Sequence, residues 1–501
     1  MENRSVKQPN LFEALLPIII LMVSISLNVA WIGDDTLSGA NQLSLLIASG
    51  IAVVIAVKNG HKWDEIMESI TKSITSALSA ITILFIIGML SGAWMAGGIV
   101  PTMIYYGLEI LHPSFFLPAV VVICSIISVA VGSSWSTVAT IGIALLGIGK
   151  ALGFDEAIIA GAIISGAYFG DKISPLSDTT NLAAAVAQTP IFTHIRYMLY
   201  TTIPSITITI LIFIGITIWG DNLSSEVNVS EMQNIISETY KVSPWFLIVP
   251  LLTFVMIVKK MPAIPVLFIG SIMGIVCVIF FQQDFIRHIA GTEILDFKVM
   301  FTNCSRILYT STDVTTGNEA VDSLFSTGGM AGMLNTVWLI ITAMVLGGVL
   351  EANNALNKIM YLIKQRVSKT FGIVGATTGT AIFFNLTTGD QYISIVVPSR
   401  MFTNLFKKAD LRPEVLSRTI EDSATVTSVL IPWNTCGATQ ASVLGVSTWI
   451  YAPFAFFCYI SPIMTLIFAA LNYKIRKISE FEELETDETV GVVEVEDAMK
   501  E

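Results

Sequence analysis

Two aspartates and a lysine lie in the stretch GAYFGDKISPLSDTTNLAAA, between apolar segments of a chain that is 53% hydrophobic. Asp171 and Asp178 stand among Ser, Thr and Asn side chains, and Pro175 separates them. Carboxylate, hydroxyl and amide oxygens are the ligands that hard cations prefer. An aspartate at the centre of a membrane-spanning helix costs about 3 kcal/mol, so its presence calls for a reason. These residue types indicate an ion or substrate site where a helix is interrupted.

Four interruptions of this kind occur in the sequence: GSSWST (132–137), SPLSDTTN (174–181), NLTTGDQY (385–392) and PWNTCG (432–437). Each combines Gly or Pro with side-chain oxygens. An unpaired backbone group in hydrocarbon costs several kcal/mol, so such breaks are expected only inside protein or beside a watery cavity. Freed carbonyls and helix C-termini suit a cation, whereas helix N-termini suit an anion.

The candidate ion- or substrate-binding residues carry side-chain oxygens at or beside these breaks. They are Ser133, Ser134, Ser136, Thr137, Asp171, Ser174, Ser177, Asp178, Thr179, Thr180, Asn181, Asn385, Thr387, Thr388, Asp390, Gln391, Asp422, Asn434 and Thr435. Asp178 and Asp390 are the first candidates for contact with Na⁺. The alternatives are that the small polar residues only pack helices, that Asp171 pairs with Lys172 or faces water, and that Asp422 belongs to a charged surface cluster.

The elements that position these residues are apolar helices. Only 13% of the 501 residues are charged and the mean hydropathy is +0.74, whereas soluble proteins have about 25% charged residues. Repeated apolar stretches of spanning length predict an all-α polytopic membrane protein. Long apolar helices are expected at 11–32, 42–57, 78–98, 198–219, 245–258, 263–281, 335–351 and 450–471. An amphipathic elbow helix is expected at 61–77.

Charged and cysteine residues narrow the function classes. Ten acidic residues and one lysine lie between Glu480 and Glu501, so most of the net charge of −11 belongs to a solvating tail. The five cysteines show no metal-type spacing and no phosphate-binding loop is present. We therefore expect no cofactor and no enzyme activity. The first apolar run lacks a cleavage site and is expected to remain as a helix.

The two halves of the chain resemble each other. LSGAWMAGGIVPTMIYY (90–106) aligns with LGGVLEANNALNKIMYL (346–362), and 43 residues separate Gly132 from Pro175 as well as Gly389 from Pro432. If each half crosses the membrane five times, with one re-entrant hairpin and one unwound helix, the second half is inverted relative to the first. Inverted repeats with breaks in corresponding positions are typical of secondary transporters, whose site lies at the breaks.

The expected organisation follows from this repeat and from the basic residues, which gather on one face if 115–150 and 371–406 are re-entrant. That face is cytoplasmic and holds both termini, although the long segment 283–334 must then be external despite three basic residues. The expected parts are a cytoplasmic N-terminus (1–10), membrane repeat 1 (11–219), an external loop (220–244), membrane repeat 2 (245–471, with 283–334 inserted) and an acidic cytoplasmic tail (472–501).

The motifs GSSWSTVATIGIALLGIG, GAYFGDKISPLSDTTNLAA, TTGDQY with VVPSRMF, and IPWNTCGA together resemble the NhaC family of sodium/proton antiporters. The resemblance covers about Ala14 to Leu471. It implies two inverted repeats whose hairpin tips and unwound helices hold sodium, with Ser133–Thr137 facing Ser174–Asn181 and Thr387–Gln391 facing Asn434–Cys436. Relatives in this superfamily include malate/lactate antiporters and amino-acid transporters, so the resemblance leaves the exchanged substrate open.

Three function classes can be compared against these residues. The first is sodium/proton antiport by alternating access in the plasma membrane. The alternative is sodium- or proton-coupled antiport of an organic anion or amino acid, which would need a larger cavity and a cationic group. A membrane enzyme is disfavoured because the four histidines fall at segment ends or loops, and a receptor is disfavoured because it would not need repeated breaks. The expected partners are Na⁺, H⁺ and the lipid bilayer, with an organic substrate and a homodimer left open, and no nucleic acid.

Proton coupling calls for a carboxylate, since hydroxyls and amides do not titrate near neutral pH. Burial disfavours the charged form of a carboxylate, and sodium favours it. The order of candidates for the group that binds either ion is Asp178, then Asp390, with Asp422 and Asp171 behind them.

Overall fold

The computed structural model describes residues 7–32, 38–219, 229–312, 322, 325–355, 358, 367 and 369–479. These residues are almost entirely helical, and the extended pairing among them is limited to the isolated bridges Thr312–Thr327 and Leu411–Lys477. Helices satisfy every backbone group internally, which is what an apolar chain in a bilayer requires. Eight described helices are long and apolar enough to cross a membrane, or ten if each bent pair counts as one span. The expected all-α polytopic class is confirmed at this level.

The first half begins with five helices: α1 (Leu11–Ile32), α2 (Ala40–Lys58), α3 (Trp63–Ser76), α4 (Leu78–Ala96) and α5 (Ile99–Ile110). The amphipathic helix α3 matches the expected elbow helix. The rest of this half is broken: α6 (Phe116–Val131), α7 (Ser134–Thr137), a π-helical turn (Val138–Gly142), α8 (Ile143–Ala151), α9 (Glu156–Ile173) and α10 (Asp178–Val186), followed by the long α11 (Ile191–Trp219). Helix α11 begins at Ile191, earlier than the start at residue 198 that the apolar residues predicted. His194 and Arg196 lower the hydropathy of this stretch but do not interrupt the helix.

The segment between the halves contains α12 (Val229–Thr239), α13 (Ile248–Val258), α14 (Ala263–Phe281), α15 (Gln283–Ala290), α16 (Phe297–Tyr309) and α18 (Gly329–Gly332). The second half continues with α19 (Leu334–Ala352), α21 (Thr370–Thr388), α22 (Gln391–Lys408), α23 (Pro413–Ile420), a π-helical turn (Glu421–Thr425), α24 (Val426–Ser428), α25 (Thr435–Leu444), α26 (Thr448–Tyr451) and α27 (Phe456–Ala470). The last apolar stretch was expected as one helix but bends by 54° between α26 and α27, where Pro453 cannot donate a backbone hydrogen bond.

Two helical hairpins carry two of the breaks at their tips. Helix α6 returns through α7 and α8, and the stacked rings of Phe116 and Phe154, 5.3 Å apart, bring the open ends of this hairpin together. Helices α21 and α22 form the second hairpin, and Val367 and Phe406 share one apolar cluster at its open end. The tips are Gly132 and Gly389, both left-handed, with φ of 71° and 64°.

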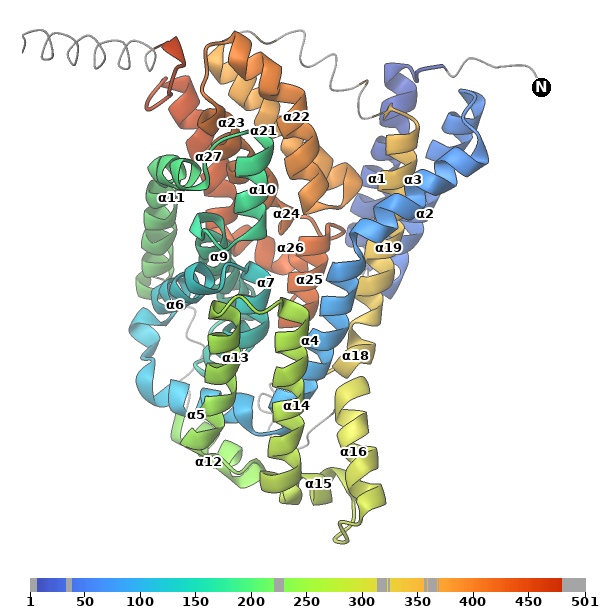
Figure 1. Cartoon of the computed structure of the whole chain (residues 1–501). Coiled ribbons are helices and arrows are strands. Elements are labelled where there is room, and N and C mark those ends of the chain that lie inside the picture. Colours follow the sequence, from blue (N-terminus) through green and yellow to red (C-terminus); the bar gives the residue numbers. More distant parts are fainter. Residues whose placement is uncertain are drawn as a thin grey trace, which may run out of the picture.

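The helices are arranged so that the breaks meet near the middle of the molecule (Figure 1). Helices α1, α2 and α3 pack with α19 on one flank, while α6, α9 and α11 form the other. Helix α4 and its neighbour α14 lie between these groups. The beginning of α1 and the end of α27 lie at the same end of the bundle, at the top of Figure 1.

Candidate ion-binding cavity

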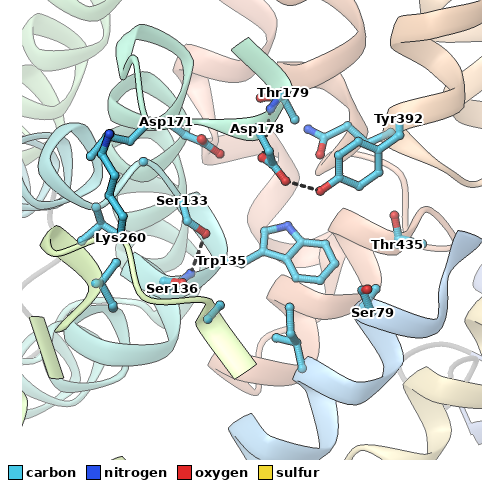
Figure 2. A pocket seen from close by; sticks show the side chains of 18 of the residues that line it. Ser79, Ser133, Trp135, Ser136, Asp171, Asp178, Thr179, Lys260, Tyr392 and Thr435 are labelled. Carbon is cyan, nitrogen blue, oxygen red and sulfur yellow. Dashed lines mark hydrogen bonds between the residues drawn. The ribbon is translucent and has the colours of Figure 1, made fainter. Parts of the chain in front are cut away.

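A cavity of about 440 Å³, called here the main cavity, is lined by residues from all four breaks. The contributing break residues are Gly132, Ser133, Trp135, Ser136, Asp171, Pro175, Leu176, Asp178, Thr179, Asp390, Gln391, Tyr392 and Thr435. The remaining wall comes from the first turns of α4, including Ser79 and Ile83, and from the α13–α14 turn with Lys260. Figure 2 shows the polar side chains of both halves around this one space. Residues expected for two separate sites, one in each half, therefore line a single cavity.

The first hairpin tip presents its hydroxyls because the chain reverses at Gly132. After this left-handed residue, Ser133 is extended and caps α7, accepting a hydrogen bond at Oγ from the Ser136 amide at 3.2 Å. A side-chain cap of this kind satisfies a free amide at a helix start. Ser133, Trp135 and Ser136 then face the main cavity.

The second break places two carboxylates at different depths. Asp171 is only 5% exposed, and its Oδ2 accepts hydrogen bonds from the Ser134 amide and hydroxyl at 3.0 and 2.7 Å. Its Oδ1 has no hydrogen-bond partner. Asp178 begins α10 and is exposed, and its Oδ1 accepts from the Thr179 amide at 2.9 Å. Asp171 therefore ties the unwound helix to the hairpin tip and leaves one oxygen free beside the cavity.

The third break contributes a carboxylate and a cross-link between the halves. Asp390 is 2% exposed, follows the left-handed Gly389 and caps α22 by accepting from the Ile393 amide at 2.7 Å. Two residues later, the Tyr392 hydroxyl donates to Asp178 Oδ2 at 2.5 Å, as Figure 2 shows. This bond joins residues 214 positions apart and holds α22 against α10 at the cavity.

The fourth break is fixed by an asparagine. Asn434 caps α25 by accepting from the Cys436 amide at 3.0 Å, and its amide group donates to the Asn385 carbonyl and side chain, both at 3.2 Å. The Thr435 amide donates to the Gly389 carbonyl at 2.8 Å. These bonds attach the start of α25 to the tip of the second hairpin and leave Thr435 on the cavity wall.

Behind the cavity lies a buried ion pair that sequence reasoning did not find. Lys172 and Asp422, both fully buried, form a salt bridge, and Ser461, Thr201 and Thr465 also bond to Asp422. Lys172 thus pairs with Asp422, and the alternative pairing of Lys172 with Asp171 is not observed. The sequence gives little signal for this pair, because its members are 250 residues apart.

Next to this pair, Glu421 is fully buried and contacts Thr179, a residue of the cavity wall. The Thr179 hydroxyl donates to Glu421 Oε1 at 3.2 Å, while Glu421 Oε2 has no hydrogen-bond partner. Since Thr179 lines the main cavity, Glu421 is one side chain removed from it. Its position at the start of the π-helical turn Glu421–Thr425 fits the tendency of such turns to occur at functional places.

The predicted residues divide into two groups. Those that line the main cavity are Ser133, Ser136, Asp171, Asp178, Thr179, Asp390, Gln391 and Thr435. The others are not among the residues that line it: Ser134, Thr137, Ser174, Ser177, Thr180, Asn181, Asn385, Thr387, Thr388, Asp422 and Asn434. Many of these bond to backbone groups near the breaks, as Thr180 does with the Lys172 carbonyl at 2.9 Å. Sequence reasoning did not select Tyr392, Lys260, Ser76 of α3 or Ser79 of α4. The only signal at these positions is a polar residue type beside an apolar segment.

The wall of the main cavity offers oxygen donors of the kind that hard cations prefer. Three carboxylates share it with hydroxyl and amide oxygens, and the described residues hold no group of three His, Cys, Asp or Glu side chains that could bind a metal ion. Oxygen donors of mixed charge suit a cation that must bind and leave.

A serine–histidine pair lies elsewhere in the bundle. Ser417 Oγ is 2.7 Å from His194 Nδ1, and both residues are fully buried. His194 Nε2 has no hydrogen-bond partner, and neither residue is part of the main-cavity wall. A hydrolytic pair needs substrate access and a third group to orient the histidine, so this contact supports packing only.

Comparison with known proteins links this architecture to transport. A family model described as the Na⁺/H⁺ antiporter family matches residues 166–473. The chain is 35% identical over 435 residues to the Na⁺/H⁺ antiporter NhaC of Alkalihalophilus pseudofirmus, covering 87% of this chain and 91% of that protein. It is also 35% identical over 467 residues to the malate-2H⁺/Na⁺-lactate antiporter of Bacillus subtilis, with coverage of 93% and 95%. A third relative, the arginine/ornithine antiporter ArcD of Halobacterium salinarum, is 35% identical over 472 residues, with 93% of each chain covered.

Proposed function

This chain belongs to the Na⁺/H⁺ antiporter family, and we propose that it is a secondary transporter that exchanges sodium for protons by alternating access. The observation that carries the proposal is the meeting of Asp171, Asp178 and Asp390 with hydroxyl side chains in one cavity formed by four helix breaks. Charged side chains at such breaks are costly in a bilayer and mark ion pathways.

The proposed ion contacts are the carboxylates on the cavity wall. Asp171 Oδ1 lacks a hydrogen-bond partner, and Asp390 is almost fully buried beside Gln391. A sodium ion in the cavity would favour the charged form of such a carboxylate, and a proton would displace it. Binding one ion or the other, but not both, couples the two fluxes. We keep Asp178 as the first candidate for the shared group because it is the carboxylate most open to the cavity.

We also propose that 11–219 and 245–471 are inverted membrane repeats, with 1–10 and the acidic tail 472–501 in the cytoplasm. Local structure at the breaks supports this. Gly132 with Ser133 and Gly389 with Asp390 form the same left-handed turn followed by an extended capping residue. The basic residues expected on one face support a main cavity that opens towards the cytoplasm of a plasma-membrane protein.

A second candidate cargo is an organic anion or amino acid. The main cavity, at about 440 Å³, has the size of small-molecule sites, and Lys260 on its wall supplies a cationic group for a carboxylate. The names of two relatives point in the same direction. Sodium/proton exchange remains the main proposal because the wall holds three carboxylates and one lysine.

Transport by the purified protein in proteoliposomes tests both candidates. An internal pH dye would report proton movement when a sodium gradient is imposed, without organic substrate and with malate, lactate or arginine and ornithine added. We expect sodium alone to change the internal pH. Proton movement that requires an organic substrate would contradict simple sodium/proton exchange and favour the second cargo.

A further inference from the structure

A second cavity, of about 210 Å³, lies towards the opposite end of α4 from the main cavity. Its wall is formed mainly by Ile87, Ser91 and Met95 of α4, by Ile143, Leu146, Gly147 and Lys150 of α8, and by the end of α25 from Ser442 to Gly445. Its rim reaches solvent at Lys150 and Glu156, whose side chains are 28% and 42% exposed and form an ion pair at 3.2 Å. No part of the proposed sodium site uses this space.

The two cavities follow the same faces of the same helices. On α4, Ser79 and Ile83 line the main cavity, and Ile87 and Ser91 line the second one. Residues four apart lie on one face of a helix, so this series is a single stripe. On the first hairpin, Ser136 faces the main cavity, and Ile143, two turns along, faces the second.

Helix α25 repeats this arrangement. Thr435 lines the main cavity and Ser442, seven residues later, lines the second. Helix α25 packs against α4, against the π-helical turn Val138–Gly142 and against α8. The cavity-lining faces of α4, the first hairpin and α25 therefore lie side by side along the direction from one cavity to the other.

A thin buried layer separates the cavities. Val138 and Ala139 on the hairpin, and Ala438 and Thr439 on α25, lie between the two sets of lining residues and are at most 3% exposed. At 1.5 Å per residue, the layer is one to two turns thick, or about 6–10 Å. The π-helical turn Val138–Gly142 lies in this layer, and π-helical turns are locally adaptable parts of a helix.

We propose that the second cavity is the external half of the transport route, closed in this structure by that layer. The inference rests on the proposed function, because only a transporter needs the route, but it does not depend on which ion or substrate is carried. Ser91, Ser442 and Thr327 supply hydroxyl oxygens along this half, which suits a cation that has left the carboxylates of the main cavity. Opening would part α4 from α8 and α25 at the layer and close the main cavity.

Cysteine labelling with a membrane-impermeant maleimide tests the route, with a matched pair on one helix face. Ser91→Cys lies in the second cavity and Ser79→Cys lies in the main cavity, twelve residues away on α4. The five native cysteines are buried, so the otherwise unchanged full chain serves as the blank. Ser442→Cys on α25 is a second reporter if Ser91→Cys is poorly folded.

In right-side-out vesicles we expect Ser91→Cys to react, at a rate that changes several-fold when sodium is removed or the pH is lowered. Ser79→Cys should react in inside-out vesicles and be protected in right-side-out ones. Failure of both Ser91→Cys and Ser442→Cys to react from outside under any ionic condition would overturn the route. A rate that never depends on sodium, protons or organic substrates would also overturn it, because it would indicate a fixed surface recess. A labelling rate that changes only when an organic substrate is added would support the proposed route and contradict sodium as the proposed cargo.

Discussion

The aspartates at the breaks share a residue type but differ in surroundings, and the differences assign them different tasks. Asp178 is exposed and lines the cavity, whereas Asp171 and Asp390 are almost fully buried. Asp171 accepts hydrogen bonds from the hairpin tip, and Asp390 caps a helix. Asp422 is fully buried in an ion pair with Lys172. A carboxylate that exchanges ions must be reachable from the cavity. Asp422, by contrast, is enclosed by Lys172 and three hydroxyl groups and joins elements of the bundle.

Asp178→Asn should abolish exchange while leaving the protein inserted and folded. The amide keeps the shape of the side chain and its bond with Tyr392, but it loses the charge that binds a cation. Tyr392→Phe is the complementary control, because it removes the Tyr392–Asp178 hydrogen bond and keeps the carboxylate. We expect at most a several-fold loss of rate in that variant. Exchange at the wild-type rate by purified Asp178→Asn would contradict the assignment.

Lys172→Met should destabilise the protein rather than alter its ion affinity. Removing one partner of a buried ion pair leaves an uncompensated charge and typically costs about 3–5 kcal/mol. The melting temperature in detergent should therefore fall clearly. Combining Lys172→Met with Asp422→Leu should restore much of the loss, because neither charge then remains. A melting temperature unchanged by the single substitution would show that the pair is not structural.

At the scale of elements, each break is built by the same local devices. A left-handed glycine ends the first helix of each hairpin, and an extended Ser, Asp or Asn caps the next helix at all four breaks. The cap satisfies amides that the break exposes, so the chain can stop and restart a helix inside the bundle without leaving buried donors unpaired.

Gly132→Ala should damage both folding and exchange. A methyl group on Gly132 would lie 2.6 Å from the Leu176 Cβ and 2.9 Å from the Ser177 amide nitrogen, and the left-handed φ adds strain. The hairpin tip would have to move away from the unwound helix, at a cost of about 1–3 kcal/mol. Gly50→Ala in α2 is the control, since the added methyl would have no atom within 4 Å apart from the neighbouring backbone of its own helix. We expect that variant to keep its melting temperature and its transport rate.

The sequence predicted the positions of the breaks and most bounds of the long uninterrupted helices, because these depend on local signals. Gly132 and Gly389 and the apolar runs around them are visible without any tertiary information. The single cavity, the Tyr392–Asp178 bond and the Lys172–Asp422 pair depend on contacts more than 200 residues apart. The spacing of residues within one segment does not indicate such contacts. The sequence alone therefore could not distinguish the predicted residues that line the cavity from those that do not.

At the scale of the whole molecule, the halves contribute unequal charge to one space. In the alignment of the halves, Asp178 corresponds to Thr435 and Asp390 to Ser133, and all four residues line the main cavity. Each aspartate thus has a neutral oxygen donor as its counterpart in the other half. This arrangement keeps the number of buried charges low while surrounding a cation with oxygens.

Sodium affinity should rise with pH, and one aspartate should be responsible. If sodium and a proton compete for the same carboxylate, the apparent affinity falls by about tenfold for each pH unit below the range in which that group titrates. Calorimetry of sodium binding between about pH 6 and pH 9 measures this slope for the wild type and for Asn variants of Asp178, Asp390, Asp171 and Asp422. The variant that lacks the shared group should bind sodium with little pH dependence, or not at all. If all four variants keep the wild-type slope, the competition takes place at none of these aspartates.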